Sequence, residues 1–223
     1  MKISSFLYTL LIAAIFGCNT NTSTSSEVRD STVVTIDTVA ASLEVLDTVA
    51  KVVIVDTPTL VKDLSREILT LLKDSNYQKL SSYFHPVEGV RFSPYGFVDT
   101  KIHQQFSAAE FNQHAANKKN IYWGNYDGSG DSILLTIPQY RKRFIYNADF
   151  LNAPKNSYNS IIGKGNSLNN LVKVYPGSYF TENHFPGFKK EYAGMDWTSL
   201  RLVFKPYQNK LYLVAIVHDQ WTS

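Results

Sequence analysis

The residues best suited to acid–base or ligand-binding chemistry lie near the C-terminal end, where His218, Asp219 and Trp221 follow an apolar run. Successive side chains of a strand point to opposite faces, so register decides what a carboxylate faces. If residues 206–209 form a turn and Lys205 lies opposite Lys210, Asp219 and Trp221 continue a uniformly apolar face. That face contains Leu200, Leu202, Phe204, Leu211, Leu213, Ala215 and Val217. A carboxylate at the rim of an apolar concavity is typical of a ligand site; the alternative is a strand-end carboxylate satisfied by backbone groups or an arginine.

Further polar residues are candidates for the same site. His184 stands two residues after Glu182, so both side chains share one strand face. Arg201 and His218 fall on the other face of the hairpin, and a bulge or one-residue slip would exchange the two faces. This register predicts that Leu202→Asp prevents folding and that Arg201→Ala is tolerated. The candidate pocket consists of Asp219, Trp221, His184, Arg201 and His218.

Metal and cofactor chemistry have little support in the residue pattern. A catalytic zinc site needs three protein ligands, and Glu182, His184, His85 and His218 show no helical His-x-x-x-His spacing. Nucleophilic catalysis is not indicated either, because no G-x-S-x-G motif occurs. We therefore predict no metal and no cofactor. Acid–base catalysis by Asp219 with His184 or Arg201 remains the enzymatic alternative.

Two loop motifs and the charge balance exclude other classes. Asn125–Asp131 resembles the opening of a calcium loop, but its twelfth position is Thr136 and not glutamate, which favours a turn. Gly163–Asn166 lacks the second glycine-lysine element and the following helix of a phosphate-binding loop. The formal net charge is +3, and the densest basic run is Arg141-Lys142-Arg143, which favours a solvated helix face and no nucleic-acid partner. The three tryptophans could form a glycan or peptide platform or pack in the core.

Local patterns predict the elements that position these residues. Thr57 and Pro58 suit a helix start, and apolar residues then repeat at helical spacing to Leu72. A second short helix covers 77–84, and capping boxes at Ser107–Glu110 and Thr136–Gln139 begin two more. Extended segments are expected at Val90–Val98, Leu171–Tyr175, Tyr179–Phe185, Thr198–Lys205 and Lys210–Gln220.

This order of elements resembles the cystatin-like cone shared by nuclear-transport-factor-like and SnoaL-like domains. The resemblance covers 57–223 and implies an α+β domain whose curved antiparallel sheet wraps N-terminal helices and leaves a pocket. The phrases Gly89–Tyr95, Tyr126–Gly130 and His218–Thr222 also look like those of uncharacterised bacterial secreted proteins, a likeness that implies no activity.

The N-terminal segment predicts the cellular address. Lys2 precedes an apolar run from Phe6 to Phe16, too short to span a bilayer, and Gly17-Cys18 follows. This resembles the lipobox of bacterial lipoproteins, which implies that 1–18 is a signal ending at an acylated Cys18. The alternative is an ordinary secretory signal.

The resemblance further implies anchoring in a lipid bilayer at the cell envelope, facing periplasm or exterior. Asn19 is not the aspartate of inner-membrane retention, which favours the outer membrane. Residues 19–56 are rich in Ser and Thr and repeat Asp-Thr pairs, which predicts a flexible tether or, alternatively, extra strands. Together these features predict non-catalytic binding of a small molecule, glycan or protein partner; the alternative is a pocket hydrolase or isomerase using Asp219 and a histidine.

Cys18 is expected to carry fatty acid, because it is the only cysteine of the chain and directly follows the apolar run. Metabolic labelling with a fatty-acid analogue should tag the wild type and leave Cys18→Ala unlabelled. Equal labelling of both proteins would contradict this prediction.

Overall fold

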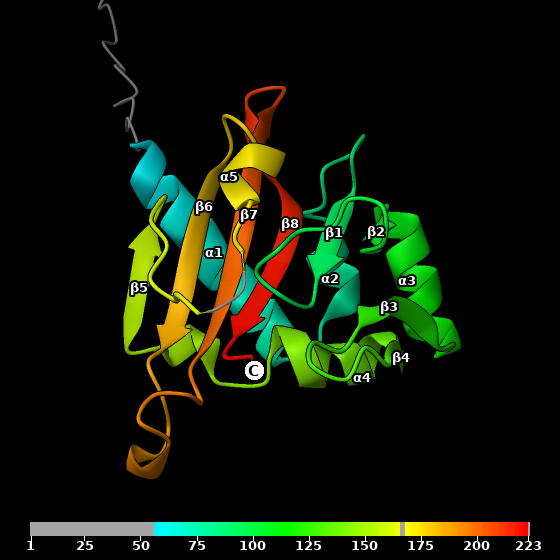
Figure 1. The fold of residues 1–223 in the computed structure, drawn as a ribbon. Coiled ribbons are helices and arrows are strands. Elements are labelled where there is room, and N and C mark those ends of the chain that lie inside the picture. The colour runs from blue at the N-terminus through cyan, green and yellow to red at the C-terminus, as the bar shows by residue number, and fades with distance from the viewer. Residues whose placement is uncertain (1–55, 166–167, 223) are drawn as a thin grey trace, which may run out of the picture. The chain divides into compact units, whose positions relative to one another are not determined.

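A computed structural model describes residues 56–165 and 168–222. Within them, six strands form one sheet in the order β2-β1-β8-β7-β6-β5, and a separate hairpin joins β3 (Ile121–Asn125) to β4 (Ser132–Leu135). The sheet consists of β1 (Val90–Ser93), β2 (Gln105–Phe106), β5 (Lys155–Tyr158), β6 (Tyr179–Phe185), β7 (Thr198–Tyr207) and β8 (Lys210–Gln220). Figure 1 shows α1 behind β6 and β7, so the predicted α+β class is confirmed.

Helix α1 (Thr57–Lys73) forms where the apolar periodicity predicts a helix. Its N-cap is Asp56, whose carboxylate accepts a hydrogen bond from the amide of Thr59, and the helix itself begins at Thr57. Pro58 lies in the first turn, where no amide donor is needed. The buried stripe of α1 consists of Val61, Ser65, Ile68, Leu69, Leu71 and Leu72.

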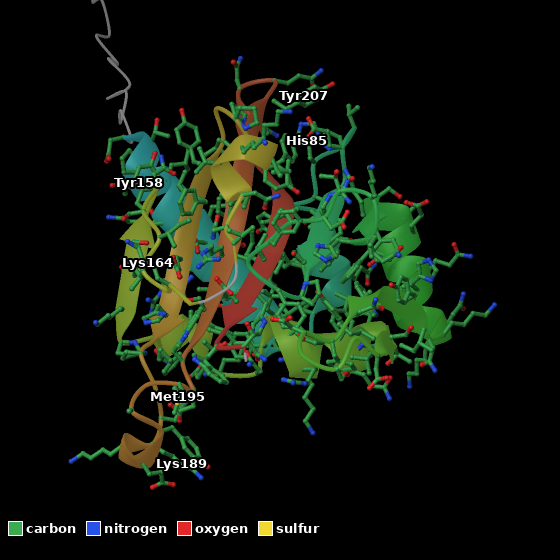
Figure 2. All side chains as sticks on the ribbon, viewed as in Figure 1. His85, Tyr158, Lys164, Lys189, Met195 and Tyr207 are labelled. Carbon is green, nitrogen blue, oxygen red and sulfur yellow. The ribbon has the colours of Figure 1, made fainter. Side chains whose placement is uncertain are left out.

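The remaining helices are short. Helix α2 (Tyr77–Ser81) follows α1, and both predicted capping boxes are confirmed, at the starts of α3 (Ala108–Asn117) and α4 (Ile137–Tyr140). A π-helical turn, η1 (Arg141–Ile145), continues α4, and 3₁₀ turns occur at η2 (Phe150–Asn152) and η3 (Lys190–Tyr192). Figure 2 shows Lys189 and Met195 in the β6–β7 connection, which extends beyond the end of the sheet.

Two strand predictions and the expected strand direction are corrected. Segment 171–175 is helix α5 (Leu171–Val174) with its C-cap Tyr175 instead of a strand, and Pro176 and Gly177 follow the cap. The sheet is mixed and not wholly antiparallel, because β1 runs parallel to β8. Strand β1 ends at Ser93 since Pro94 cannot donate to a ladder, whereas the prediction extended it to Val98.

The register of the last hairpin also differs from the expected one. Gln208 and Asn209, with φ of 46° and 61°, form a two-residue turn, so Tyr207 and not Lys205 lies opposite Lys210. In β8, Leu213 lies opposite Phe204 and Ala215 lies opposite Val203. Val214 between them has no partner in β7 and therefore forms a β-bulge.

This bulge exchanges the faces of β8 relative to β7. Leu202 now lies opposite Ile216, and Ser199 lies opposite Asp219. Asp219 therefore shares a face with Arg201 and not with Leu202, contrary to the prediction.

Both faces of the sheet are covered. On the helix face, Leu200, Leu202 and Ile216 pack in one core with Ile68 and Leu72 of α1. On the opposite face, Val203, Ala215 and Val217 pack with Phe180 and Leu171. Residues 159–165 and 168–178, which include α5, are called the strap. The strap crosses this second face of the sheet, which is called the strap face (Figure 1).

The predicted signal 1–18 and the predicted tether, apart from Asp56, lie outside the described residues. Among the helices of the described part, none is long and apolar enough to cross a membrane.

Candidate functional site

Two of the predicted site residues, Arg201 and Asp219, meet with Glu182 in a buried ion cluster on the strap face. Arg201 Nη1 donates to Asp219 Oδ2 at 2.9 Å, and Nη2 donates to Glu182 Oε1 at 3.1 Å. Both Arg201 and Glu182 are fully buried, and Asp219 nearly so. A buried ion pair of this kind is stable only when further hydrogen bonds satisfy the charged groups.

The strap supplies those hydrogen bonds. The amides of Ile162 and Gly163 donate to the two oxygens of Glu182 at 2.7 and 2.9 Å, and Arg201 donates to the carbonyl of Gly163 at 3.1 Å. A side chain at Gly163 would place its Cβ 2.5 Å from Ser199 Oγ, so this close approach requires glycine. The ion cluster therefore fastens the strap to the sheet.

The two carboxylates differ in their proton affinity. Burial raises the pKa of Asp219, and the neighbouring Arg201 only partly opposes this shift. Burial also disfavours ionised Glu182, but Arg201, Ser199 and the strap amides together lower the pKa of Glu182. The environment of Glu182 thus favours its ionised form beside Arg201, whereas Asp219 takes up a proton more readily than an exposed aspartate does.

The histidines occupy separate places. His184 shares the strap face with Glu182, as predicted, and its Nδ1 lies 2.8 Å from Ser199 Oγ. His218 lies on the helix face, where its Nδ1 donates to the carbonyl of Pro94 at 2.9 Å and its Nε2 lies 3.0 Å from Thr198 Oγ1. Burial lowers the pKa of His184, and it lowers the pKa of His218 to about 4. Both side chains are therefore neutral at pH 7.

Trp221 is partly exposed. Its side chain is 36% exposed, and its amide donates to the carbonyl of Trp197. Of the other tryptophans, Trp123 is fully buried and stacks on Tyr140, which assigns it to the core. Among the described residues, no group of three or more His, Cys, Asp or Glu residues is arranged to hold a metal ion.

A second site, which the sequence did not predict, is a groove between α1 and the β5–β6 edge, called the helix groove. Its volume is about 270 Å³. It is lined by Lys62, Asp63, Ser65, Arg66, Leu69, Leu151, Asn156, Ser157, Thr181 and Asn183. The groove thus combines a charged rim from α1 with polar side chains from the sheet.

The floor of the helix groove is formed by polar side chains of β6, although this face of the sheet otherwise packs on α1 through apolar residues. Thr181 and Asn183 lie opposite Leu202 and Leu200 and so share the face that packs on α1. The Thr181 hydroxyl is 2.7 Å from Ser65 Oγ, and both side chains are buried. Asn183 Nδ2 is buried without a hydrogen-bond partner in the described part of the chain. An unpaired buried amide is costly, so a ligand acceptor at the groove floor would stabilise it.

The sequence signal that could have revealed the helix groove is the presence of polar residues at positions that face the core. Thr181 and Asn183 alternate with Phe180 and Glu182 in β6, and Ser65 interrupts the apolar stripe of α1. Each alone is ordinary, and only the packing of α1 on β6 brings them together.

No family model matches the chain, and no curated protein matches it. Among solved structures, a domain described as a calcium/calmodulin dependent protein kinase II association domain, from Xanthomonas campestris, is 10% identical. The match covers 73% of this chain and 86% of that chain. Its TM-score of 0.31 is too low to assign the fold from this similarity. The α+β assignment therefore rests on the topology described above.

Arg201→Ala is expected to destabilise the domain by about 3–5 kcal/mol at pH 7, because it leaves two buried carboxylates without their cation. This reverses the sequence-based expectation that Arg201→Ala is tolerated. Urea unfolding should show the loss, whereas Lys142→Ala, on the surface, should change stability by less than about 0.5 kcal/mol.

A pH series tests the cause of that loss. Without the guanidinium, the pKa of both carboxyls rises on folding, so their contribution favours folding at low pH and is lost as pH rises. The deficit of Arg201→Ala should therefore be smaller at pH 4.5 than at pH 7. A deficit that is equal at both pH values would assign the loss to packing alone.

His218 is expected to make stability fall with acidification. Its pKa of about 4 in the folded chain lies below the ordinary 6.5. The contribution of neutral His218 to the free energy of unfolding is therefore complete above pH 6.5 and is lost as pH falls toward 4. Between pH 7.5 and 5 this amounts to about 2 kcal/mol. His218→Gln keeps a donor and an acceptor but does not titrate, so its urea midpoint should fall less over this interval. Parallel losses in both proteins would contradict the assignment.

Proposed function

We propose that this chain is a non-catalytic binding protein of the bacterial cell envelope that holds a small polar ligand in the helix groove. The observation that carries the proposal is the buried, unpartnered Asn183 Nδ2 in a groove that otherwise lies at a core interface. The likeness of the element order to cone-type domains supports it, since those domains enclose a pocket between sheet and helices.

The chemistry of the lining favours binding over catalysis. The helix groove is lined by hydroxyl, amide, ammonium, guanidinium and carboxylate groups, with no histidine or cysteine among its lining residues. Such groups orient a ligand by hydrogen bonds and charge. The enzymatic alternative, Asp219 with a histidine, has less support, because Asp219 is bonded to Arg201 and His218 faces the other side of the sheet.

The lining also defines the class of ligand. Asn183 Nδ2 calls for an oxygen acceptor at the floor, and Ser65 and Thr181 can exchange hydrogen bonds with hydroxyl groups. At the rim, Lys62 and Arg66 outnumber Asp63, so a ligand with a negative group gains there. A volume of about 270 Å³ suits a ligand the size of a monosaccharide or its acid derivative.

Anchoring is the second part of the proposal. The lipobox resemblance at Cys18 supports attachment to a lipid bilayer, and the composition of 19–56 supports a tether between bilayer and domain. On this proposal the protein presents its groove on the periplasmic or exterior side of the envelope, with the outer membrane favoured.

The test is a thermal-shift screen of the full chain against monosaccharides, sugar acids, amino acids and small organic acids, with calorimetry of any hit. Asn183→Leu should abolish binding of the hit, because no side-chain donor remains at the groove floor. Its melting temperature without ligand should stay the same or rise, because an unpaired buried amide is removed.

Gln113→Leu provides the matched control, because Gln113 is exposed on α3 and does not line the groove. This variant should bind as the wild type does. Equal binding by Asn183→Leu would place the ligand elsewhere, and a panel without any stabilising compound would contradict the ligand class.

A further inference from the structure

A second polar cavity, called the strap-end cavity, lies where the end of the strap meets β1, β7 and β8. Its volume is about 260 Å³. It is lined by Glu88, Arg91, Thr100, Gln105, Val174, Tyr175, Pro176, Ser178, Lys205 and Val214. The bulge in β8 contributes Val214, which has no partner residue in the ladder. This cavity shares no lining residue with the helix groove.

A tight turn holds two hydroxyl groups together in this cavity. Tyr175-Pro176-Gly177-Ser178 joins α5 to β6, and the Ser178 amide donates to the Tyr175 carbonyl at 3.3 Å. Gly177 has φ of 71°, which with Pro176 before it is typical of a type II turn. Tyr175 and Ser178 are the first and last residues of the turn, so its backbone fixes their spacing.

Neither hydroxyl oxygen has a partner at hydrogen-bond geometry within the described residues, although Arg91 is close enough to Tyr175 to influence it. The oxygens of Tyr175 and Ser178 are both buried and unpartnered in the described part of the chain. Buried polar groups are almost always paired, so two unpaired donors in one cavity wall call for an explanation. Burial raises the pKa of Tyr175 to about 12 against the opposing effect of the nearby Arg91, so its hydroxyl keeps its proton and remains a donor at neutral pH.

The charge of the cavity is positive. Arg91 is held by neutral acceptors only: its guanidinium donates to the carbonyls of Thr100 and His103, at 3.1 and 2.6 Å, and to the side chain of Gln105. Arg91 forms no ion pair with any described residue, whereas Lys205 pairs with Glu88. One cation of the lining is therefore not neutralised.

We infer that the strap-end cavity binds a carboxylate or phosphate group, with Arg91 as the charge partner and the hydroxyls of Tyr175 and Ser178 as donors. An anionic oxygen accepts hydrogen bonds from all three groups, whereas a cation or a purely apolar ligand would leave the donors unpaired. Because the cavity is larger than a bare phosphate ion requires, the ligand is a small molecule that carries such a group.

The test measures binding of inorganic phosphate, phosphoserine, succinate and neutral glycerol to the full chain, by calorimetry and thermal shift at constant ionic strength. The wild type should be stabilised saturably by phosphates or by succinate, and not by glycerol. The two anion arms distinguish a phosphate from a carboxylate ligand. Arg91 is left intact, since it braces the loop that follows β1.

Tyr175→Phe and Ser178→Ala remove one hydroxyl each. Either change should weaken anion binding tenfold or more, because a hydrogen bond to a charged group is lost. Without anion, both variants should melt at or above the wild-type temperature, because each loses an unpaired buried polar group. Tyr192→Phe, on the exposed β6–β7 connection, is the matched control and should bind as the wild type does.

The inference would be overturned by no saturable binding of any anion by the wild type, or by equal binding by wild type, Tyr175→Phe and Ser178→Ala. Lowered melting temperatures of both variants without anion would likewise overturn it, since the hydroxyls would then have structural partners. Asn183→Leu should keep the part of the anion binding that Tyr175→Phe and Ser178→Ala remove, so this inference and the proposal for the helix groove can fail separately.

Discussion

A fully buried guanidinium is the constraint around which the strap face is organised. Arg201 lies in a central strand of a sheet covered on both sides, where an uncompensated charge would cost several kcal/mol. Two carboxylates compensate it, and their excess negative charge is relieved by strap amides at Glu182 and by the raised pKa of Asp219. The path of the strap is therefore set by hydrogen bonding as well as by apolar burial. Gly163 is required where the strap backbone comes closest to the sheet.

Both cavities lie at the margins of the layers that cover the sheet. At the β5–β6 edge, α1 contacts the sheet through the Ser65–Thr181 hydroxyl pair, and Asn183 beyond it has an unpaired amide. At the end of the strap, Tyr175 and Ser178 are unpaired in the same way. Unpaired polarity alone does not define a site, because the Tyr140 hydroxyl and Arg201 Nε are also unpartnered and line neither cavity. What distinguishes the two margins is the combination of unpaired donors with an open volume and unbalanced charge.

Sequence patterns predicted the elements whose signals are local. The limits of β6 and β8 agree with the expected ones, and both capping boxes form, because alternation and capping act within a few residues. The bulge at Val214 was not predictable, since it depends on how β8 packs against β7 and β1 at once. Because of this one extra residue, Asp219 lies on the strap face and not on the helix face, where the pocket was predicted. The helix groove was missed for a related reason, because Asn156, Asn183 and Ser65 come from three elements.

The register of β8 also separates binding from catalysis at the predicted site. His218 and Asp219 are adjacent in sequence and therefore lie on opposite faces of the strand, so they cannot exchange a proton directly. His184 is on the same face as Asp219, but its Nδ1 contacts Ser199 while Asp219 pairs with Arg201. A general acid or base needs a reachable proton and a pKa near neutrality. His218 is buried with a pKa of about 4, and its ring nitrogens contact Pro94 and Thr198. These residues consequently stabilise the fold, and both proposals therefore place a ligand at the polar groups that have no hydrogen-bond partner among the described residues.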